Sequence, residues 1–136
     1  MNLGTVPSRV IDVPETTDVL PPLGRSPDFV DHEAGVWHYT QTDANRHVNS
    51  MEYLRSMEDF VACALAARGH DLRVLYPARA RIVYRKPCFR GERYERAAWL
   101  RGDSPLVVAG TFRKHGERPD APPAVAIVLT FDVRAP

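Results

Sequence analysis

A single strong helical pattern, followed only by strand patterns, is the feature of this chain that most constrains its fold. Apolar side chains recur at steps of three and four, the spacing of one helix face: Met51, Leu54, Met57, Val61 and Leu65. Asn49 with Glu52 three residues later is typical of a helix start, and Arg68 followed by Gly69 of a helix end. The sequence therefore predicts one helix over residues 50–68.

The second half of this helix and its surroundings favour a two-layer fold. Beyond Phe60 the helix is apolar on several sides, so we expect it to be buried there, with Cys63 in the core. Residues 35–41 mix β-branched and aromatic side chains and predict a first strand. Four more strands are expected at 80–86, 93–101, 106–113 and 125–133, separated by turn residues. One helix on one antiparallel sheet is an α+β architecture, and the order excludes a doubly wound sheet.

Composition limits the class of protein further. The chain has 136 residues, is 44% hydrophobic and carries a net charge of +1, which fits one globular domain and argues against a general nucleic-acid binder. The most apolar run, residues 60–67, is too short to predict a membrane span. The chain has two cysteines, too few for a disulfide framework, so we expect a reducing, cytoplasmic compartment.

The first 31 residues differ in composition from the rest of the chain. They hold five of the twelve prolines and little sustained periodicity, so we predict an extended N-terminal arm or linker over 1–31 and a folded domain over 32–136. Val10, Ile11 and Val13 could add an edge strand within the arm.

Polar residues gather where the first strand leads into the helix. Asp43, Asn45, His47 and Asn49 occupy alternate positions there. The free N–H groups and the dipole of a helix N-terminus favour developing negative charge, which acyl transfer needs at the attacked carbonyl oxygen. Asp43 or His47 could act as base or nucleophile, with Asn45 orienting it. The alternative is ordinary turn and capping chemistry, which is common in Asx-rich loops.

Two segments resemble a known family. Residues 42–53, TDANRHVNSMEY, resemble the D-x-N-x-H-V-N-N-x-x-Y segment of hotdog-fold thioesterases, most closely the acyl-acyl carrier protein thioesterases. Residues 82–88, IVYRKPC, are similar to the Y-R-R-E-C strand of that family. The resemblance extends from Trp37 to the C-terminus and implies a hotdog fold, in which a curled antiparallel sheet wraps one long central helix.

The resemblance also implies an assembly. Hotdog domains pair, so we expect a homodimer or a higher even oligomer. The carrier-protein thioesterases hold two hotdogs in one polypeptide, and this chain resembles the second of them, with residues 1–31 resembling the connecting linker. The chain is therefore either self-sufficient as a dimer or half of a longer protein.

Site residues follow from the same resemblance. Asp43, Asn45 and His47 match family positions assigned to catalysis. Cys88 matches a cysteine that attacks the substrate in one mechanism of the family. In the competing mechanism a glutamate beside the cysteine is the base, but Pro87 stands at that position here. The base or nucleophile is then His47, Asp43 or Cys88.

Substrate-binding residues are expected on both sides of this group. Asn49 and Ser50 at the helix N-terminus would polarise the carbonyl. Between residues 79 and 101 there are eight basic residues and two acidic ones, either a solvated face or an anion-attracting patch. Within it, Arg85, Lys86 and Arg90 could meet the pantetheine phosphates or an acidic carrier protein. The histidines lack metal-ligand spacing and no C-x-x-C occurs, so we expect neither a metal nor a cofactor.

These observations predict an acyl thioesterase acting on a fatty-acyl or related thioester of acyl carrier protein or coenzyme A. One alternative is a hotdog acyltransferase or dehydratase that acts on carrier-bound acyl chains. The other is a catalytically silent hotdog that binds acyl groups or serves as a dimerisation scaffold, which Pro87 favours.

Overall fold

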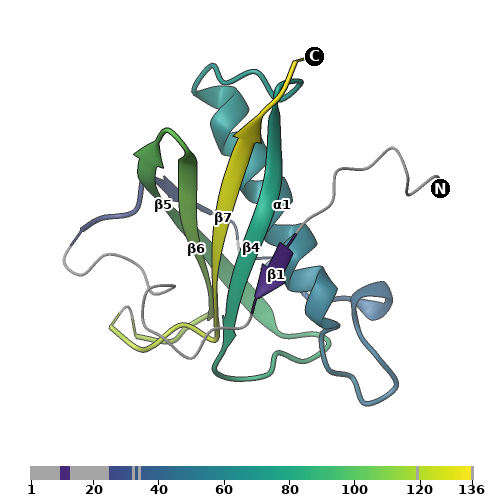
Figure 1. Ribbon diagram of the computed structural model, residues 1–136. Helices are drawn as coiled ribbons and strands as arrows, with labels where there is room; N and C mark the ends of the chain where they lie inside the picture. Colours follow the sequence, from purple (N-terminus) through teal and green to yellow (C-terminus); the bar gives the residue numbers. More distant parts are fainter. Residues whose placement is uncertain (1–9, 13–24, 32, 34, 119, 136) are drawn as a thin grey trace.

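One long helix, α1 (Ser50–Ala67), lies against one face of a curved sheet, as Figure 1 shows. The computed structural model describes residues 10–12, 25–31, 33, 35–118 and 120–135. Its strands are β1 (Val10–Asp12), β2 (Phe29–Val30), β3 (Gly35–Val36), β4 (Leu75–Tyr84), β5 (Arg93–Asp103), β6 (Leu106–Lys114) and β7 (Val125–Val133). The strand order is β1-β4-β7-β6-β5-β2, and β3 pairs with another part of β5. All pairs are antiparallel except β1 with β4, which is parallel. The predicted α+β class and the helix-on-sheet arrangement are confirmed.

The helix begins and ends where the sequence predicts. The Asn49 side chain accepts the Met51 N–H at 3.0 Å and so caps the first turn. At the other end, Gly69 has a φ of +91°, a left-handed conformation that glycine adopts without steric cost. Both limits follow from local chemistry.

The helix is buried on one face only, which corrects the prediction of a segment buried all round. Its buried residues are Tyr53, Leu54, Ser56, Met57, Val61 and Leu65. Cys63 is exposed and therefore lies outside the core. Met51 is 44% exposed, and Tyr53 takes the inward position of the first turn instead. A single sheet covers only one side of a helix, so the small apolar residues on its far side stay near the surface.

The predicted first strand is shorter than expected. Only Gly35–Val36 forms a strand, followed by a short 3-10 helix, Tyr39–Gln41. The Trp37 amide still donates to the Glu92 carbonyl at 3.1 Å, but the indole is fully buried. Beyond it, the Gln41 side chain accepts the His38 amide at 3.1 Å and closes a turn. Local side-chain bonding therefore replaces the strand ladder.

The core lies between α1 and the inner face of the sheet. Its largest fully buried side chains include Trp37, Leu54, Met57, Phe112 and Leu129. The helix and the sheet approach closely at Gly110, where a Cβ atom would lie 2.4 Å from the Met57 sulfur. Only glycine therefore fits at this crossing without moving Met57.

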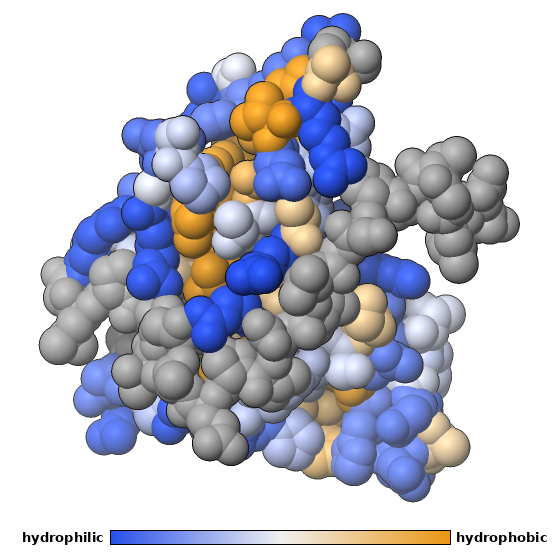
Figure 2. Space-filling view, in the orientation of Figure 1, coloured by the Kyte–Doolittle hydropathy of each residue, from blue (hydrophilic) through white to orange (hydrophobic). Residues whose placement is uncertain are grey.

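The outer face of the sheet carries a small apolar centre among polar residues. Ala109, Ala126 and Val128 form a second buried cluster there, and Figure 2 shows hydrophobic residues on this side flanked by hydrophilic ones. A pocket of about 340 Å³ on this face is lined by Arg79, Arg81, Arg101, Val107, Val128 and Thr130. The outer face is therefore mixed rather than a continuous apolar surface.

Parts of the predicted arm contribute strands. Residues 10–12 pair with β4 as the expected edge strand, and residues 29–30 pair with β5. Asp28 ties the following segment to the sheet, because its Oδ2 accepts the Leu100 amide at 2.7 Å. The rest of the arm, residues 1–9 and 13–24, lies outside the described residues, so the division at residue 31 stays a prediction. In the described part of the chain, no helix is long and apolar enough to span a membrane.

Candidate active site

The polar loop before the helix is built around the Asp43 carboxylate. Its Oδ1 accepts the Asn45 amide at 2.9 Å and the His47 amide at 3.0 Å. The Asp43 amide in turn donates to the His47 carbonyl at 2.9 Å. Arg46 between them has a φ of +67°, a conformation uncommon for a side chain with a Cβ. Asp43 therefore fixes the loop, as the capping and turn alternative predicts.

The loop is also held from outside, by the connection between β4 and β5. The Val48 amide donates to the Cys88 carbonyl at 2.9 Å, and the Arg90 amide to the Arg46 carbonyl at 2.8 Å. The Arg90 side chain donates to Thr42 Oγ1 at 2.9 Å and lies over the Tyr39 ring, 5.0 Å from its centroid. Arg90 thus braces the loop.

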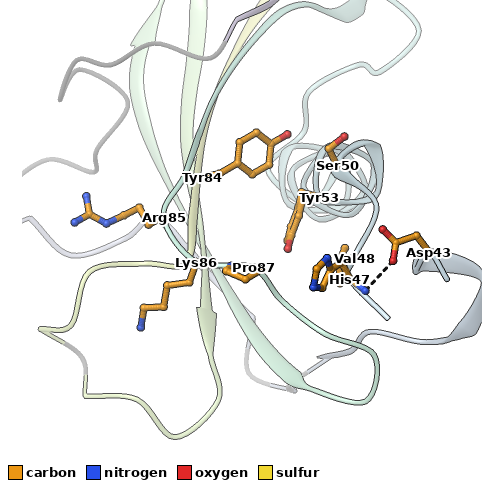
Figure 3. A pocket seen from close by; sticks show the side chains of 9 residues that line it. All are labelled: Asp43, His47, Val48, Ser50, Tyr53, Tyr84, Arg85, Lys86 and Pro87. Atoms are coloured by element: carbon orange, nitrogen blue, oxygen red, sulfur yellow. Dashed lines mark hydrogen bonds between the residues drawn. The ribbon is translucent and has the colours of Figure 1, made fainter. Parts of the chain in front are cut away.

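A pocket of about 450 Å³ opens where this loop, the helix N-terminus and the end of β4 meet. Its lining residues are Asp43, His47, Val48, Ser50, Tyr53, Tyr84, Arg85, Lys86 and Pro87. In Figure 3, Asp43 and His47 lie on one side, Arg85 and Lys86 extend away on the other, and Tyr53 and Pro87 lie between. The pocket therefore has an acid and an imidazole at one end, a cationic end, and an apolar middle.

The Asp43–His47 end has the groups that carbonyl chemistry needs. Asp43 Oδ1 is used by the loop, whereas its Oδ2 accepts no hydrogen bond from the described residues and is available to a water molecule. The first N–H groups of a helix have no intrahelical partner; here the Asn49 side chain accepts the Met51 amide and the Asn49 carbonyl accepts the Glu52 amide at 2.9 Å, and neither bond uses the Ser50 amide. The Ser50 amide is thus a candidate donor to an oxyanion, with the helix dipole acting in the same direction.

Cys88 lies beneath the pocket and does not line it. It is 1% exposed, and its amide donates to the Tyr53 hydroxyl at 3.0 Å. Burial is the main cause that raises the pKa of the Cys88 thiol, and burial likewise raises the pKa of Tyr53. A thiol attacks as the thiolate, so this environment keeps Cys88 in its less reactive form.

We expect iodoacetamide at pH 8 to label Cys63 at least tenfold faster than Cys88, because Cys63 is exposed and Cys88 is buried with a raised pKa. Mass spectrometry of the labelled peptides measures both rates. Labelling in guanidinium chloride is the control, where both thiols should react alike. Equal rates in the folded protein would contradict the structural role of Cys88.

Five of the predicted site residues line the pocket: Asp43, His47, Ser50, Arg85 and Lys86. The others lie outside it. Asn49 caps the helix, Asn45 contributes its amide to the Asp43 turn, Cys88 is buried, and Arg90 braces the loop. The described residues contain no cluster of side chains able to hold a metal ion.

Four lining residues, Val48, Tyr53, Tyr84 and Pro87, are not among the predicted site residues. All four lie within the two segments that carry the family resemblance. Burial raises the pKa of Tyr84, an effect that the Ser50 hydroxyl partly offsets. The two tyrosines form an aromatic wall of the pocket, which the polar residues of the motif do not predict.

Comparison with known proteins rests on structure alone, because no family model and no curated protein sequence matches the chain. A hypothetical protein from Aquifex aeolicus superposes with a TM-score of 0.65 at 17% identity, covering 79% of this chain and 99% of its own. A Staphylococcus aureus hypothetical protein, solved in complex with CoA, gives 0.67 at 15% identity over 80% and 72% of the two chains. The 12:0-ACP thioesterase from Umbellularia californica gives 0.62 at 15% identity, over 88% of this chain. This chain has the hotdog fold.

The structural neighbours differ in length. The chain spans 42% of the Umbellularia thioesterase and 44% of an acyl-ACP thioesterase from Bacteroides thetaiotaomicron, which superposes with a TM-score of 0.59 at 15% identity. It spans nearly all of the Aquifex protein. One hotdog unit therefore accounts for the described residues.

Proposed function

We propose that this hotdog protein is a thioesterase that hydrolyses an acyl thioester of coenzyme A or acyl carrier protein. The observation that carries the proposal is one pocket that is lined by Asp43, His47 and Ser50 on one side and by Arg85 and Lys86 on the other. Structural neighbours add support, since one was solved with CoA and two are acyl-ACP thioesterases. Both kinds of substrate present a thioester next to a phosphate-bearing pantetheine arm.

In the proposed reaction, the thioester carbonyl lies at the N-terminus of α1. Water held by Asp43 Oδ2 adds to the carbonyl carbon while Asp43 or His47 takes its proton. The Ser50 amide and the helix dipole stabilise the oxyanion. The carbon–sulfur bond then breaks, and the departing thiolate takes up the proton that Asp43 or His47 accepted from water. We assign the attack to water and not to Cys88, because that thiol is buried beneath the pocket.

The cationic end would hold the anionic part of the substrate. Lys86 is already paired with Glu117 at 2.5 Å, whereas the exposed Arg85 side chain has no ion-pair partner among the described residues. Arg85 is therefore the better test of this role. Arg90 is unsuitable, because its removal would also release the loop.

Arg85→Glu should raise KM roughly threefold to tenfold with little change in kcat, because exposed charge contacts are worth up to about 1 kcal/mol and reversal adds repulsion. Steady-state kinetics at low and high salt measures the effect, which added salt should reduce. Arg93→Glu, an exposed arginine of the same basic stretch outside the pocket, is the matched control. A fall in kcat alone, or equal effects of the two variants, would contradict the role.

One observation favours a second candidate function, a hotdog that binds acyl thioesters without cleaving them. Pro87 lines the pocket at the place where the family resemblance expects a glutamate base. The side chain of a proline can neither accept a proton nor hydrogen-bond to water. Such a protein would bind acyl-CoA and release no thiol.

Release of free thiol from a panel of acyl-CoA and acyl-carrier thioesters tests the proposal. We expect hydrolysis by the purified chain in a homodimer or higher even oligomer, the assembly that the resemblance to hotdog thioesterases implies. The assay is run on fractions from size-exclusion chromatography. Thioester binding without thiol release would favour the binding protein instead.

A further inference from the structure

Two tyrosines form the aromatic part of the pocket wall, the buried Tyr53 and the partly exposed Tyr84. Tyr53 comes from the first turn of α1 and Tyr84 from the end of β4, and both line the pocket (Figure 3). Their rings meet edge to face, with centroids 5.9 Å apart. Tyr53 is 3% exposed and its hydroxyl accepts the Cys88 amide at 3.0 Å. The Tyr53 ring is therefore fixed in place.

The region behind Tyr53 is filled. Its ring contacts Trp37 and Phe112, at centroid distances of 5.1 and 5.7 Å, and both are fully buried. One helical turn further on, Met57 is also fully buried and packs directly on Gly110. Trp37, Phe112 and Met57 therefore fill the space directly behind Tyr53, into which a long alkyl chain would otherwise continue.

The remaining space suits a small group. The pocket volume of about 450 Å³ lies in the lower half of the usual range for small-molecule sites, roughly 300–1,000 Å³. It must hold the thioester and the adjoining pantetheine as well as the acyl group. A ring placed there would lie beside two aromatic side chains, and aromatic groups pack favourably on one another in edge-to-face or offset-stacked contacts.

We propose that Tyr53 and Tyr84 stop the acyl group, so that the site selects compact acyl thioesters and fits an arylacyl group best. This inference rests on the proposed function, since it assumes that the thioester carbonyl lies by Asp43 and Ser50. It goes beyond that function by naming the substrate class and the residues that set it. It also differs from the fatty-acyl substrate that the family resemblance implies.

The experiment compares kcat/KM for phenylacetyl-, butanoyl-, dodecanoyl- and hexadecanoyl-CoA. We expect the phenylacetyl and butanoyl thioesters to exceed hexadecanoyl-CoA by at least tenfold. Tyr84→Ala should raise the dodecanoyl-to-butanoyl ratio at least fivefold, because it opens the wall. Tyr76→Ala is the matched control on the same strand, since Tyr76 packs under Arg134, outside the pocket, and should leave the ratio unchanged.

The possible outcomes distinguish failure of the tyrosine stop from failure of the proposed function. If hexadecanoyl-CoA is the best substrate, the tyrosine stop is wrong and the thioesterase proposal stands. If no thioester is cleaved, the proposed function fails, and binding of non-hydrolysable thioethers still tests the stop. Calorimetry should then show tighter binding of phenylethyl-CoA than of hexadecyl-CoA; equal or tighter binding of the hexadecyl compound would overturn the inference.

Discussion

Replacing Asp43 with Asn should lower kcat for thioester hydrolysis by about 100- to 10,000-fold, the usual contribution of a positioned general base. The carboxamide oxygen of Asn can still accept the Asn45 and His47 amides that hold the loop. The substitution therefore removes the charge and basicity at Oδ2 and keeps the turn. We expect the melting temperature to change by only a few degrees.

His47→Ala should lower kcat as well, because it removes an imidazole from the pocket while its main chain keeps the loop bonds. Two exposed residues outside the pocket serve as matched controls, Asp59→Asn on α1 and His70→Ala beyond its end, and both should retain full rates. Thiol-release kinetics and thermal melts are measured on the same samples. Full activity of both Asp43→Asn and His47→Ala would show that the site is assigned wrongly.

Trp37→Ala should reduce the free energy of unfolding by about 3–5 kcal/mol, the typical loss when a large buried aromatic side chain is removed. Trp37 is fully buried and stacks on Tyr94 with centroids 4.2 Å apart. It also contacts Tyr53 and Phe112, so its loss leaves a cavity beneath the pocket wall. Denaturant unfolding measures the effect.

Trp37→Phe separates the contribution of the aromatic ring from that of the indole N–H. The buried indole Nε1 has at most a weak sulfur acceptor, the Cys88 thiol, so replacing the indole with a phenyl ring leaves no strong acceptor unpaired. We expect the Phe variant to lose less than half of what the Ala variant loses. Equal losses would mean that the aromatic contacts of Trp37 are not what stabilises this region.

The parts of the fold that depend on local chemistry were predictable from the sequence. The helix limits follow from the Asn49 cap and the φ > 0 of Gly69, both of which depend on residues a few positions apart. The last strand, β7, alternates apolar residues without interruption and forms as expected. Periodicity also places the central helix and four strands in the right order.

The wrong predictions concern residues whose position depends on the elements that pack against them. Cys63 and Met51 sit in an apolar helix sequence, yet which face turns inward depends on a sheet that covers one side only. Residues 37–41 have strand-forming side chains, but the burial of Trp37 and the bond from the His38 amide to Gln41 turn the chain away from β5. Neither effect can be predicted from the strand or helix propensities of the single residues.

The candidate site also has one part that the sequence predicts and one part that it does not. Asp43, His47 and Ser50 are close in the chain, so their grouping was predictable, and the second motif placed Arg85 and Lys86 nearby. Tyr53 and Tyr84 are 31 positions apart and meet only because α1 crosses the end of β4. A local sequence motif does not predict a contact between residues of two elements that lie far apart in the chain.

Strand β1 bears on the aggregation of this protein, because it covers an edge of the sheet. It covers the outer edge of β4 at Arg79–Arg81 through a three-residue parallel pairing. Without residues 10–12, the amide and carbonyl groups along that edge would be open to strand addition by any neighbouring chain. Residues 10–12 thus cover part of this edge, and we expect their removal to increase aggregation, measured by light scattering, with a smaller effect on the free energy of unfolding.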